Sequence, residues 1–294
     1  MTIVMFHSGK EFPKYLEYTF RQLRLFNPNV TVYFLTDTQY LNLPLFEKYC
    51  ITSVDKAQYF SIKVQALNNL YKRESSSFWM ITTTRFVYIE NFLLSKKLEE
   101  VYLFENDILL YFTIANYKKI FSYLYSNLAV TVAGPDKCTT GFMYIKNGQA
   151  LQVMTDAFIR LLVRFGKKGV CHKFKLDMVN EMTLMRAFNV NTQGKGLATL
   201  PILPFGDWSV GYTEFNSIFD PASWGQYVGG TTDGIPGAKP EDHYIGQMLR
   251  QHPEYTVVWR ETDKGRVPYF RYDTQEVKIN NLHIHSKQLH KYVS

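Results

Sequence analysis

Cysteine is scarce in this sequence and lacks the spacing of a bridged or metal-bound framework. Three cysteines, Cys50, Cys138 and Cys171, occur in 294 residues, without a CxxC pair or a zinc-finger spacing. An odd number of scattered cysteines argues against both a disulfide scaffold and a zinc module. It favours free thiols in a reducing compartment.

Long apolar segments are also missing. No stretch approaches the ~18 uncharged apolar residues that indicate a membrane-spanning helix. The apolar run Ile3–Phe6 is too short for a signal peptide, and no small-residue cleavage site follows it. We find no internal repeat, low-complexity tract or flexible linker either. These absences favour a cytoplasmic protein without a membrane span.

Positive charge is in modest excess over negative charge. Lysine and arginine total 33 and acidic residues total 26, which gives a net charge of +7. Besides an ordinary basic surface, such an excess fits an anionic small-molecule ligand, nucleic acid or an acidic membrane surface. The basic residues are spread along the chain, and the densest cluster, Arg164 to Lys175, is short. This distribution argues against a nucleic-acid-binding module.

A content of 46% hydrophobic and 20% charged residues indicates a folded globular chain. Its periodicity predicts alternating strands and helices over the first two-thirds. Strands at Ile3–Phe6 and Val30–Leu35 around a helix from Lys14 to Phe26 have the size of a βαβ unit. Further predictions are helices over 61–73, 85–97, 116–125, 149–165 and 177–188, and strands over 100–110, 129–133 and 141–145. The alternation predicts an α/β fold with an open, mostly parallel sheet flanked by helices.

The last third has a different character. Glycine, proline and asparagine are frequent over 191–240, and strands are predicted over 255–259, 267–272 and 276–285. We therefore expect a C-terminal β-rich elaboration of a single domain. Four aromatic residues lie in the glycine-rich region and are interpreted either as core or as an acceptor wall or lid: Trp208, Tyr212, Phe215 and Trp224.

Three polar residues interrupt the apolar segment VYLFENDILLY. Burying Glu105, Asn106 and Asp107 without partners would cost several kcal/mol. In an extended strand Glu105 and Asp107 point to the same side, where two carboxylates suit Mg²⁺ or Mn²⁺. A capped turn or an ordinary salt bridge is the alternative interpretation.

The C-terminal segment LHIHSK adds nitrogen ligands and a cation. His283 and His285 alternate on one predicted strand, and Lys287 follows two residues later. Imidazole suits Mn²⁺ better than Mg²⁺, and a lysine beside a metal would neutralise a diphosphate. Carboxylates, imidazole and a cation together form the set that holds a metal–diphosphate.

The order of these motifs resembles that of GT-A-fold glycosyltransferases, which are metal-dependent enzymes that use nucleotide sugars. ENDILLY is similar to the family's DxD-type motif, with Glu105 in place of the first aspartate. The resemblance extends over roughly residues 1–290. It also includes TTTRFVYIENFL with Arg85, TTGFMYIKN (139–147), LDMVNEMTLM (176–185), LHIHSK, and FDPASWGQYVGG (219–230), which is similar to a loop in bacterial and viral members.

The resemblance implies a role for each matching residue. Asp107 would bind the metal directly, Glu105 would bind it through water or contact the ribose, and His285 would be the third ligand, with His283 as second choice. Lys287 would contact the β-phosphate, and Arg85 a carboxylate or the diphosphate. The strand ends would contact the base and ribose through His7, Ser8, Thr36 and Asp37. The sugar and acceptor pocket would include Thr140, Trp224, Gly225 and Asp242.

A general base is needed only if the enzyme inverts the anomeric carbon. The carboxylates that qualify are Asp177, Glu181, Glu241 and Asp242, and Glu181 is preferred. Asp177 is alternatively only the N-cap of the predicted helix. In a retaining enzyme these carboxylates would bind sugar hydroxyl groups instead.

The resemblance implies a GT-A-type, Rossmann-like single domain, 1–294, with a nucleotide-binding half (1–110) and an acceptor-binding half (111–294). We expect a hexosyltransferase that uses Mn²⁺ or Mg²⁺ and a UDP-sugar, with galactose or glucose as the first donors to test. The acceptor would be a glycan or glycoconjugate, and a viral member would act in the host cytoplasm. The alternatives are a metal-dependent nucleotide-sugar hydrolase or nucleotidyl-type enzyme, and a non-catalytic nucleic-acid-binding or glycan-binding protein.

Overall fold

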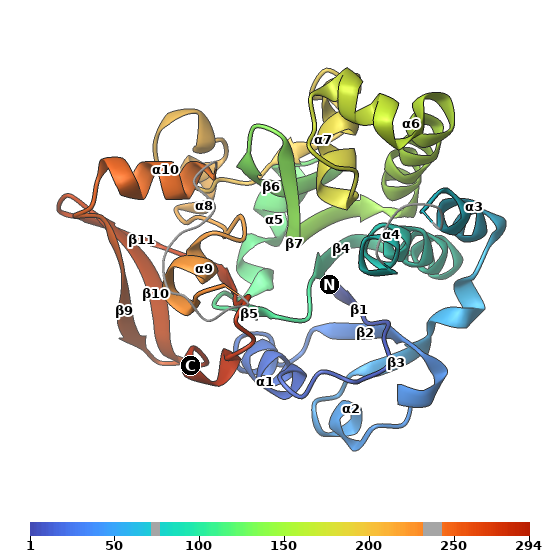
Figure 1. Cartoon of the computed structure of the whole chain (residues 1–294). Helices are drawn as coiled ribbons and strands as arrows, with labels where there is room; N and C mark the ends of the chain where they lie inside the picture. Colours follow the sequence, from blue (N-terminus) through green and yellow to red (C-terminus); the bar gives the residue numbers. More distant parts are fainter. Residues whose placement is uncertain (72–76, 232–242) are drawn as a thin grey trace.

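The computed structural model of the chain describes residues 1–71, 77–231 and 243–294. A seven-stranded sheet with the order β3-β2-β1-β4-β7-β6-β8 forms its centre (Figure 1). Only β7 runs antiparallel to its neighbours, so the predicted open, mostly parallel sheet is confirmed. The strands are β1 (Thr2–Phe6), β2 (Thr31–Thr36), β3 (Thr52–Asp55), β4 (Glu99–Phe104), β6 (Leu128–Gly134), β7 (Lys137–Asn147) and β8 (Ala198–Thr199).

Helices cover both faces of this sheet, because successive strand residues point to opposite sides. Val4 of β1 packs into a core with the helices of one layer, whereas Ile3 and Met5 pack into the core of the other. The first layer consists of α3 (Ile62–Tyr71), α4 (Ser77–Lys96), α6 (Gly148–Phe174) and α7 (Glu181–Asn191). The second consists of α1 (Leu16–Phe26), α2 (Pro44–Lys48) and α5 (Ile114–Leu124).

The C-terminal third forms the expected β-rich region, which lies on the side of the molecule opposite α3 (Figure 1). Its antiparallel sheet has the order β11-β10-β9, and a separate antiparallel pair joins β12 to β5. The strands are β5 (Ile108–Leu110), β9 (Thr256–Thr262), β10 (Gly265–Tyr272), β11 (Gln275–Lys278) and β12 (Asn281–His283). The short helices of this region are α8 (Tyr212–Phe215), α9 (Trp224–Gly229) and α10 (Tyr244–Gln251).

The prediction of one strand over 100–110 is wrong. A turn at 105–107 separates β4 from β5, and the Ile108 amide donates to the Glu105 carbonyl over 3.2 Å. The turn takes Glu105, Asn106 and Asp107 out of the central sheet. A continuous strand would have buried them within it. The predicted strand 276–285 is likewise divided into β11 and β12.

Several helix boundaries also differ from the prediction, and helix α4, predicted to begin at 85, already begins at Ser77. Helix α7 begins at Glu181, because Asn180 and Thr183 cap it reciprocally with two 3.0 Å hydrogen bonds. Asp177 is therefore not the N-cap. Helix α6 continues to Phe174, beyond a kink at Gly166, where φ is 61°.

Within the described ranges, no helix is both long enough and apolar enough to cross a membrane, and all three cysteines are free.

Candidate functional site

A cavity of about 610 Å³ opens where the central strands end. Phe6 ends β1, Glu105 directly follows β4, and Thr140 lies within β7, so three adjacent strands contribute to its wall. In open α/β sheets ligands bind beyond the carboxyl ends of the strands. The cavity has this position. Glu181 of α7 and the C-terminal residues His283, His285 and Lys287 complete the wall.

Residues far apart in sequence meet here because β12 pairs with β5. This pairing sets His283 opposite Ile108, one residue after the turn that carries the carboxylates. The Ile284 amide donates to the Asp107 carbonyl over 3.0 Å, and Thr19 Oγ1 donates to the Asn106 carbonyl over 2.6 Å. The turn is thus held from the C-terminal segment and from α1.

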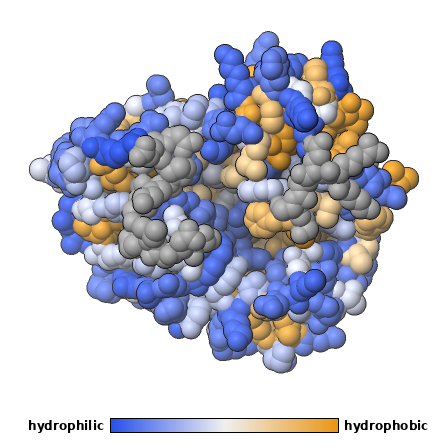
Figure 2. Space-filling model, viewed as in Figure 1, coloured by the Kyte–Doolittle hydropathy of each residue, from blue (hydrophilic) through white to orange (hydrophobic). Residues whose placement is uncertain are grey.

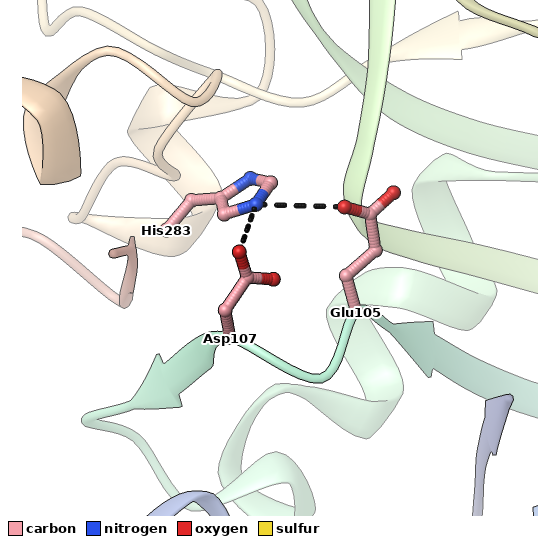
Figure 3. A group of neighbouring side chains, drawn as sticks. All are labelled: Glu105, Asp107 and His283. Atoms are coloured by element: carbon pink, nitrogen blue, oxygen red, sulfur yellow. Dashed lines mark ion pairs between the residues drawn. The ribbon is translucent and has the colours of Figure 1, made fainter. Parts of the chain in front are cut away.

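Glu105, Asp107 and His283 form a compact cluster with their ligand atoms turned toward one another (Figure 3). The Nε2 atom of His283 lies 3.4 Å from Glu105 Oε2 and 3.1 Å from Asp107 Oδ2. The three ligand atoms all lie within 4.8 Å of one another. Asp107 and His283 are buried, and Glu105 is partly buried.

Two cations flank the cluster on opposite sides. Arg85 Nη2 donates to Glu105 Oε1 over 2.5 Å and to Thr140 Oγ1 over 2.7 Å. Lys287 Nζ donates to Asp107 Oδ2. Each carboxylate therefore has its own cation in addition to the shared imidazole.

These contacts set the charge state of the carboxylates. Burial alone would raise the pKa of Glu105, but the charges of Arg85 and His283 outweigh it and lower this pKa to about 2. The pKa of Asp107 is also lowered, because His283 and Lys287 outweigh the effect of burial. Both groups are anionic at neutral pH, as metal ligands must be.

The donor set fits a divalent metal ion. Two carboxylate oxygens and one imidazole nitrogen are ligands that Mn²⁺ accepts readily. The buried Nδ1 of His283 has no hydrogen-bond partner among the described residues. The Nε2 atom, which faces both carboxylates, is thus the nitrogen available for an ion.

His285 lies apart from this group, although we expected it to be the third ligand. Its ring lies 4.1 Å from that of His283 between centroids, and its Nδ1 is 2.8 Å from Gln226 Nε2. Burial, followed by the charge of His283, lowers the pKa of His285 to about 3. The structure therefore groups His283, rather than His285, with the two carboxylates, because β12 ends at His283 and the strand alternation stops there.

Asp220 supports the cluster from behind, and sequence reasoning missed it. Its fully buried Oδ1 accepts from the Ser223 amide over 2.7 Å and from the Trp224 amide over 2.8 Å. Its Oδ2 accepts from the Gly225 and His283 amides over 2.8 Å each. One carboxylate thus joins the start of α9 to the backbone of His283. An aspartate four residues before the tryptophan in FDPASW was the available sequence signal.

Two residues of the expected sugar pocket have other surroundings. Trp224 is fully buried and packs on Phe270 with 4.8 Å between ring centroids, so its ring is not presented to the cavity. Its burial fits the alternative interpretation of this residue as part of the core. A Cβ atom on Gly225 would lie 2.1 Å from the His283 carbonyl oxygen, so only glycine permits this close approach.

The carboxylates considered as bases have different positions. Glu181 lines the cavity, is 4% exposed, and accepts a 2.6 Å hydrogen bond from Thr82 Oγ1. Burial raises the pKa of Glu181. Asp177 is exposed and is not part of the cavity wall. Glu241 and Asp242 lie outside the described residues.

The expected base and ribose residues gather at the ends of β1 and β2. Asp37 Oδ2 accepts from the Gly9 amide over 3.1 Å, and Lys56 contacts both Ser8 Oγ and Asp37. The buried Thr36 hydroxyl has no hydrogen-bond partner among the described residues. His7 Nε2 lies 3.0 Å from the carbonyl of Glu11, and burial lowers its pKa. Lys56, which sequence analysis missed, is the link between the two strand ends.

An aromatic residue of the wall was also missed. Tyr15 lines the cavity directly before α1, and the Lys287 ammonium lies 5.6 Å from the centre of its ring. Burial and the nearby charges of Asp107 and Glu105 raise the pKa of its hydroxyl. Its position beside Lys287 and near the carboxylates follows from the packing of α1 against β5, which no local pattern indicates.

No family model and no curated protein matches the sequence. Among solved structures, mouse xyloside xylosyltransferase 1 matches with 10% identity and a TM-score of 0.48, covering 72% of this chain and 90% of that one. The PaToxG glycosyltransferase matches with 14% identity and a TM-score of 0.39, covering 66% and 70%. The glycosyltransferase GlyE of Streptococcus pneumoniae TIGR4 matches with 14% identity and a TM-score of 0.40, covering 68% and 44%. All three carry the names of glycosyltransferases, but because every TM-score is below 0.5 we base the function on the residues of the site.

Proposed function

We propose that this chain is a metal-dependent glycosyltransferase that moves a hexose from a UDP-sugar to a hydroxyl group of a glycan or glycoconjugate. One observation carries the proposal. Two carboxylates and an imidazole, Glu105, Asp107 and His283, converge within one cavity between Arg85 and Lys287. This combination has the ligands for a divalent metal and the cations for a diphosphate.

Glu105, Asp107 and His283 would hold the ion, with Mn²⁺ preferred over Mg²⁺ because of the imidazole. When bound, the ion supplies positive charge that stabilises the leaving diphosphate. The partly buried site strengthens such electrostatic interactions relative to water.

The two flanking cations, Lys287 and Arg85, would have different roles. Lys287, which contacts Asp107 and is itself 44% exposed at its side chain, would bind an oxygen of the β-phosphate. Arg85 would keep Glu105 oriented, since it also holds Thr140 on the neighbouring strand. Positively charged groups that are already in position would then stabilise the negative charge that develops on the leaving group.

Glu181 is the carboxylate placed to meet the sugar or the acceptor. It would accept the proton of the acceptor hydroxyl in an inverting reaction, and would bind a sugar hydroxyl in a retaining one. Its raised pKa moves it toward the range in which a general base is effective. Thr82, which donates to Glu181, would fix its orientation.

The nucleoside would lie at the ends of β1 and β2. His7, Ser8, Thr36 and Asp37 would contact the base and ribose, with Lys56 holding the loop after β1. In this assignment residues 1–110 form the nucleotide-binding half of one domain, and residues 111–294 form the acceptor-binding half.

A screen of nucleotide sugars in the presence of Mn²⁺ tests the proposal, starting with UDP-galactose and UDP-glucose. The expected result is UDP release that increases when glycan acceptors are added, with a new glycan product. UDP release that no acceptor increases would identify a nucleotide-sugar hydrolase instead. Absence of turnover with every nucleotide sugar, together with absence of UDP binding, would refute the proposal.

A further inference from the structure

The basic residues are spread along the chain, but most of the net positive charge comes from one part of one helix. Residues 157–176, most of which belong to α6, contain six basic residues and no acidic residue. They therefore account for six of the seven net charges of the chain. The basic residues are Arg160, Arg164, Lys167, Lys168, Lys173 and Lys175.

The kink at Gly166 brings the cations of the two helical segments together. The ring of Phe165 has Arg164 on one side, with 5.1 Å from its Cζ to the ring centre, and Lys173 at 4.2 Å from its Nζ. Arg164 precedes the kink and Lys173 follows it, so the cluster is continuous in space across the break. Arg164, Lys168 and Lys173 are all exposed.

Apolar side chains are exposed within this basic segment and directly after it. Val163 is 69% exposed in α6, and Met178, in the segment that follows, is 41% exposed. Figure 2 shows hydrophobic and hydrophilic side chains side by side over the lobe that α6 and α7 form in Figure 1. The opposite side of α6 packs into the core through Leu162 and Val170, so the basic side is the outer one.

We propose that this basic face of α6, formed by Arg160, Val163, Arg164, Lys168 and Lys173, docks on an anionic lipid bilayer. Cations beside exposed aliphatic residues on the surface of a helix are the combination that binds the headgroup region of acidic membranes. The net charge of the face is complementary to such a surface. Two carboxylates flank the face. Asp156 is paired with Lys63 over 2.6 Å, whereas Asp177 is exposed and leaves one negative charge at the edge of the face.

The cluster is less suited to nucleic acid. Single strands are bound by cations together with aromatic rings that are free to stack on bases. Here the ring of Phe165 already has two cations against it, and the exposed apolar neighbours are Val163 and Met178. We therefore favour lipid over a nucleic-acid strand.

The position of the face has a consequence for the cavity. Only a short segment connects Lys175 with Glu181 and Met182, which line the cavity wall. A membrane bound to α6 would therefore lie near the cavity rim, where a glycoconjugate acceptor anchored in that membrane is within reach. Docking itself goes beyond the proposed enzyme activity and does not depend on it.

Co-sedimentation of the full chain with lipid vesicles tests the proposal. We expect binding to phosphatidylcholine vesicles that contain phosphatidylglycerol, weak binding to pure phosphatidylcholine, and loss of binding at high salt. The triple variant Arg164→Gln, Lys168→Gln, Lys173→Gln should lower the partition coefficient about 100-fold, from the usual contribution of each cation near an anionic surface. The variant Val163→Ser should lower it further by a smaller factor.

A matched control removes three exposed lysines elsewhere, Lys96, Lys97 and Lys119. It loses the same charge, so it should retain vesicle binding if the basic face of α6 is the docking surface. Equal loss in both triple variants would show a general charge effect and overturn the proposal. Binding to single-stranded or double-stranded DNA without binding to vesicles would also overturn it, and circular dichroism confirms that each variant is folded.

Discussion

A comparison of two clusters of buried charge in the described part of the chain distinguishes a candidate binding site from a purely structural ion-pair network. Lys63 lies 2.8 Å from Glu90 and 2.6 Å from both Thr155 and Asp156, joining α3, α4 and α6. Every charged group of this first cluster therefore has a partner within the cluster. In the cavity, by contrast, carboxylates and an imidazole face one another around a common point.

The difference lies in what the clusters leave unpaired. Within the described part of the chain, three of the ten buried side-chain atoms without partners lie at the cavity cluster, namely His283 Nδ1, Arg85 Nε and Asn106 Oδ1, and none belongs to the Lys63 cluster. Such atoms are uncommon in native structures and call for a function or a ligand. Buried charge alone is therefore weak evidence for a site, whereas buried charge with unpaired polar atoms on a cavity wall is stronger evidence.

The largest effect should follow Asp107→Asn, which removes a ligand charge and nearly preserves size. We expect metal-dependent transfer to fall roughly 1000-fold, because the metal contributes several kcal/mol to the stabilisation of the leaving group. Product formation at saturating Mn²⁺ measures this, and the thermal unfolding midpoint serves as control. Activity close to that of the wild type would remove Asp107 from the site.

Asp220→Asn should have the next largest effect. An amide nitrogen in place of one carboxylate oxygen cannot accept from the backbone amides that Asp220 now binds, so His283 loses part of its support. Groups that hold a metal ligand typically affect affinity 10–100-fold. Electron paramagnetic resonance of free Mn²⁺ measures the change, and an unchanged affinity in a folded variant would limit Asp220 to capping α9.

Glu90→Gln should lower stability without affecting metal binding, and would thus distinguish the roles of the two clusters. Breaking a buried ion pair costs stability, and since Lys63 keeps Asp156 we expect about 2 kcal/mol in the free energy of unfolding. Mn²⁺ affinity should stay unchanged, because Glu90 does not line the cavity. A parallel loss of Mn²⁺ affinity would mean that the two clusters are coupled. Urea unfolding and the resonance titration together give both quantities.

Asp177→Asn should have the smallest effect. This exposed side chain lies four residues before Glu181 and is not part of the cavity wall. Transfer should remain within about twofold of the wild type, as for most surface substitutions. A large decrease in kcat with an unchanged unfolding midpoint would restore Asp177 as a catalytic residue.

Much of the fold could be predicted from periodicity alone. The buried strands are continuous apolar runs and the helices have apolar faces, so Ile3–Phe6 and the helix ending at Phe26 were found nearly to the residue. The break between β4 and β5 was missed, because the apolar residues before Glu105 and after Asp107 resemble one strand. Only the pairing of β5 with β12 shows that the chain has left the central sheet.

The candidate site could be predicted in part, for a physical reason. Glu105, Asp107, His283 and Lys287 are polar residues in apolar surroundings, which a sequence displays. Asp220 acts through backbone amides, so the only sequence signal for it was its place four residues before the tryptophan in FDPASW, and its contact with the His283 amide was not predictable. The choice between His283 and His285 depended on where β12 ends, which tertiary contacts determine.

The most direct test of the central claim is calorimetric titration of the protein with UDP, with and without Mn²⁺. We expect UDP to bind in the presence of Mn²⁺, and we expect this binding to be greatly weakened when a chelator removes the metal. UDP binding that does not depend on the metal, or no binding under either condition, would contradict it.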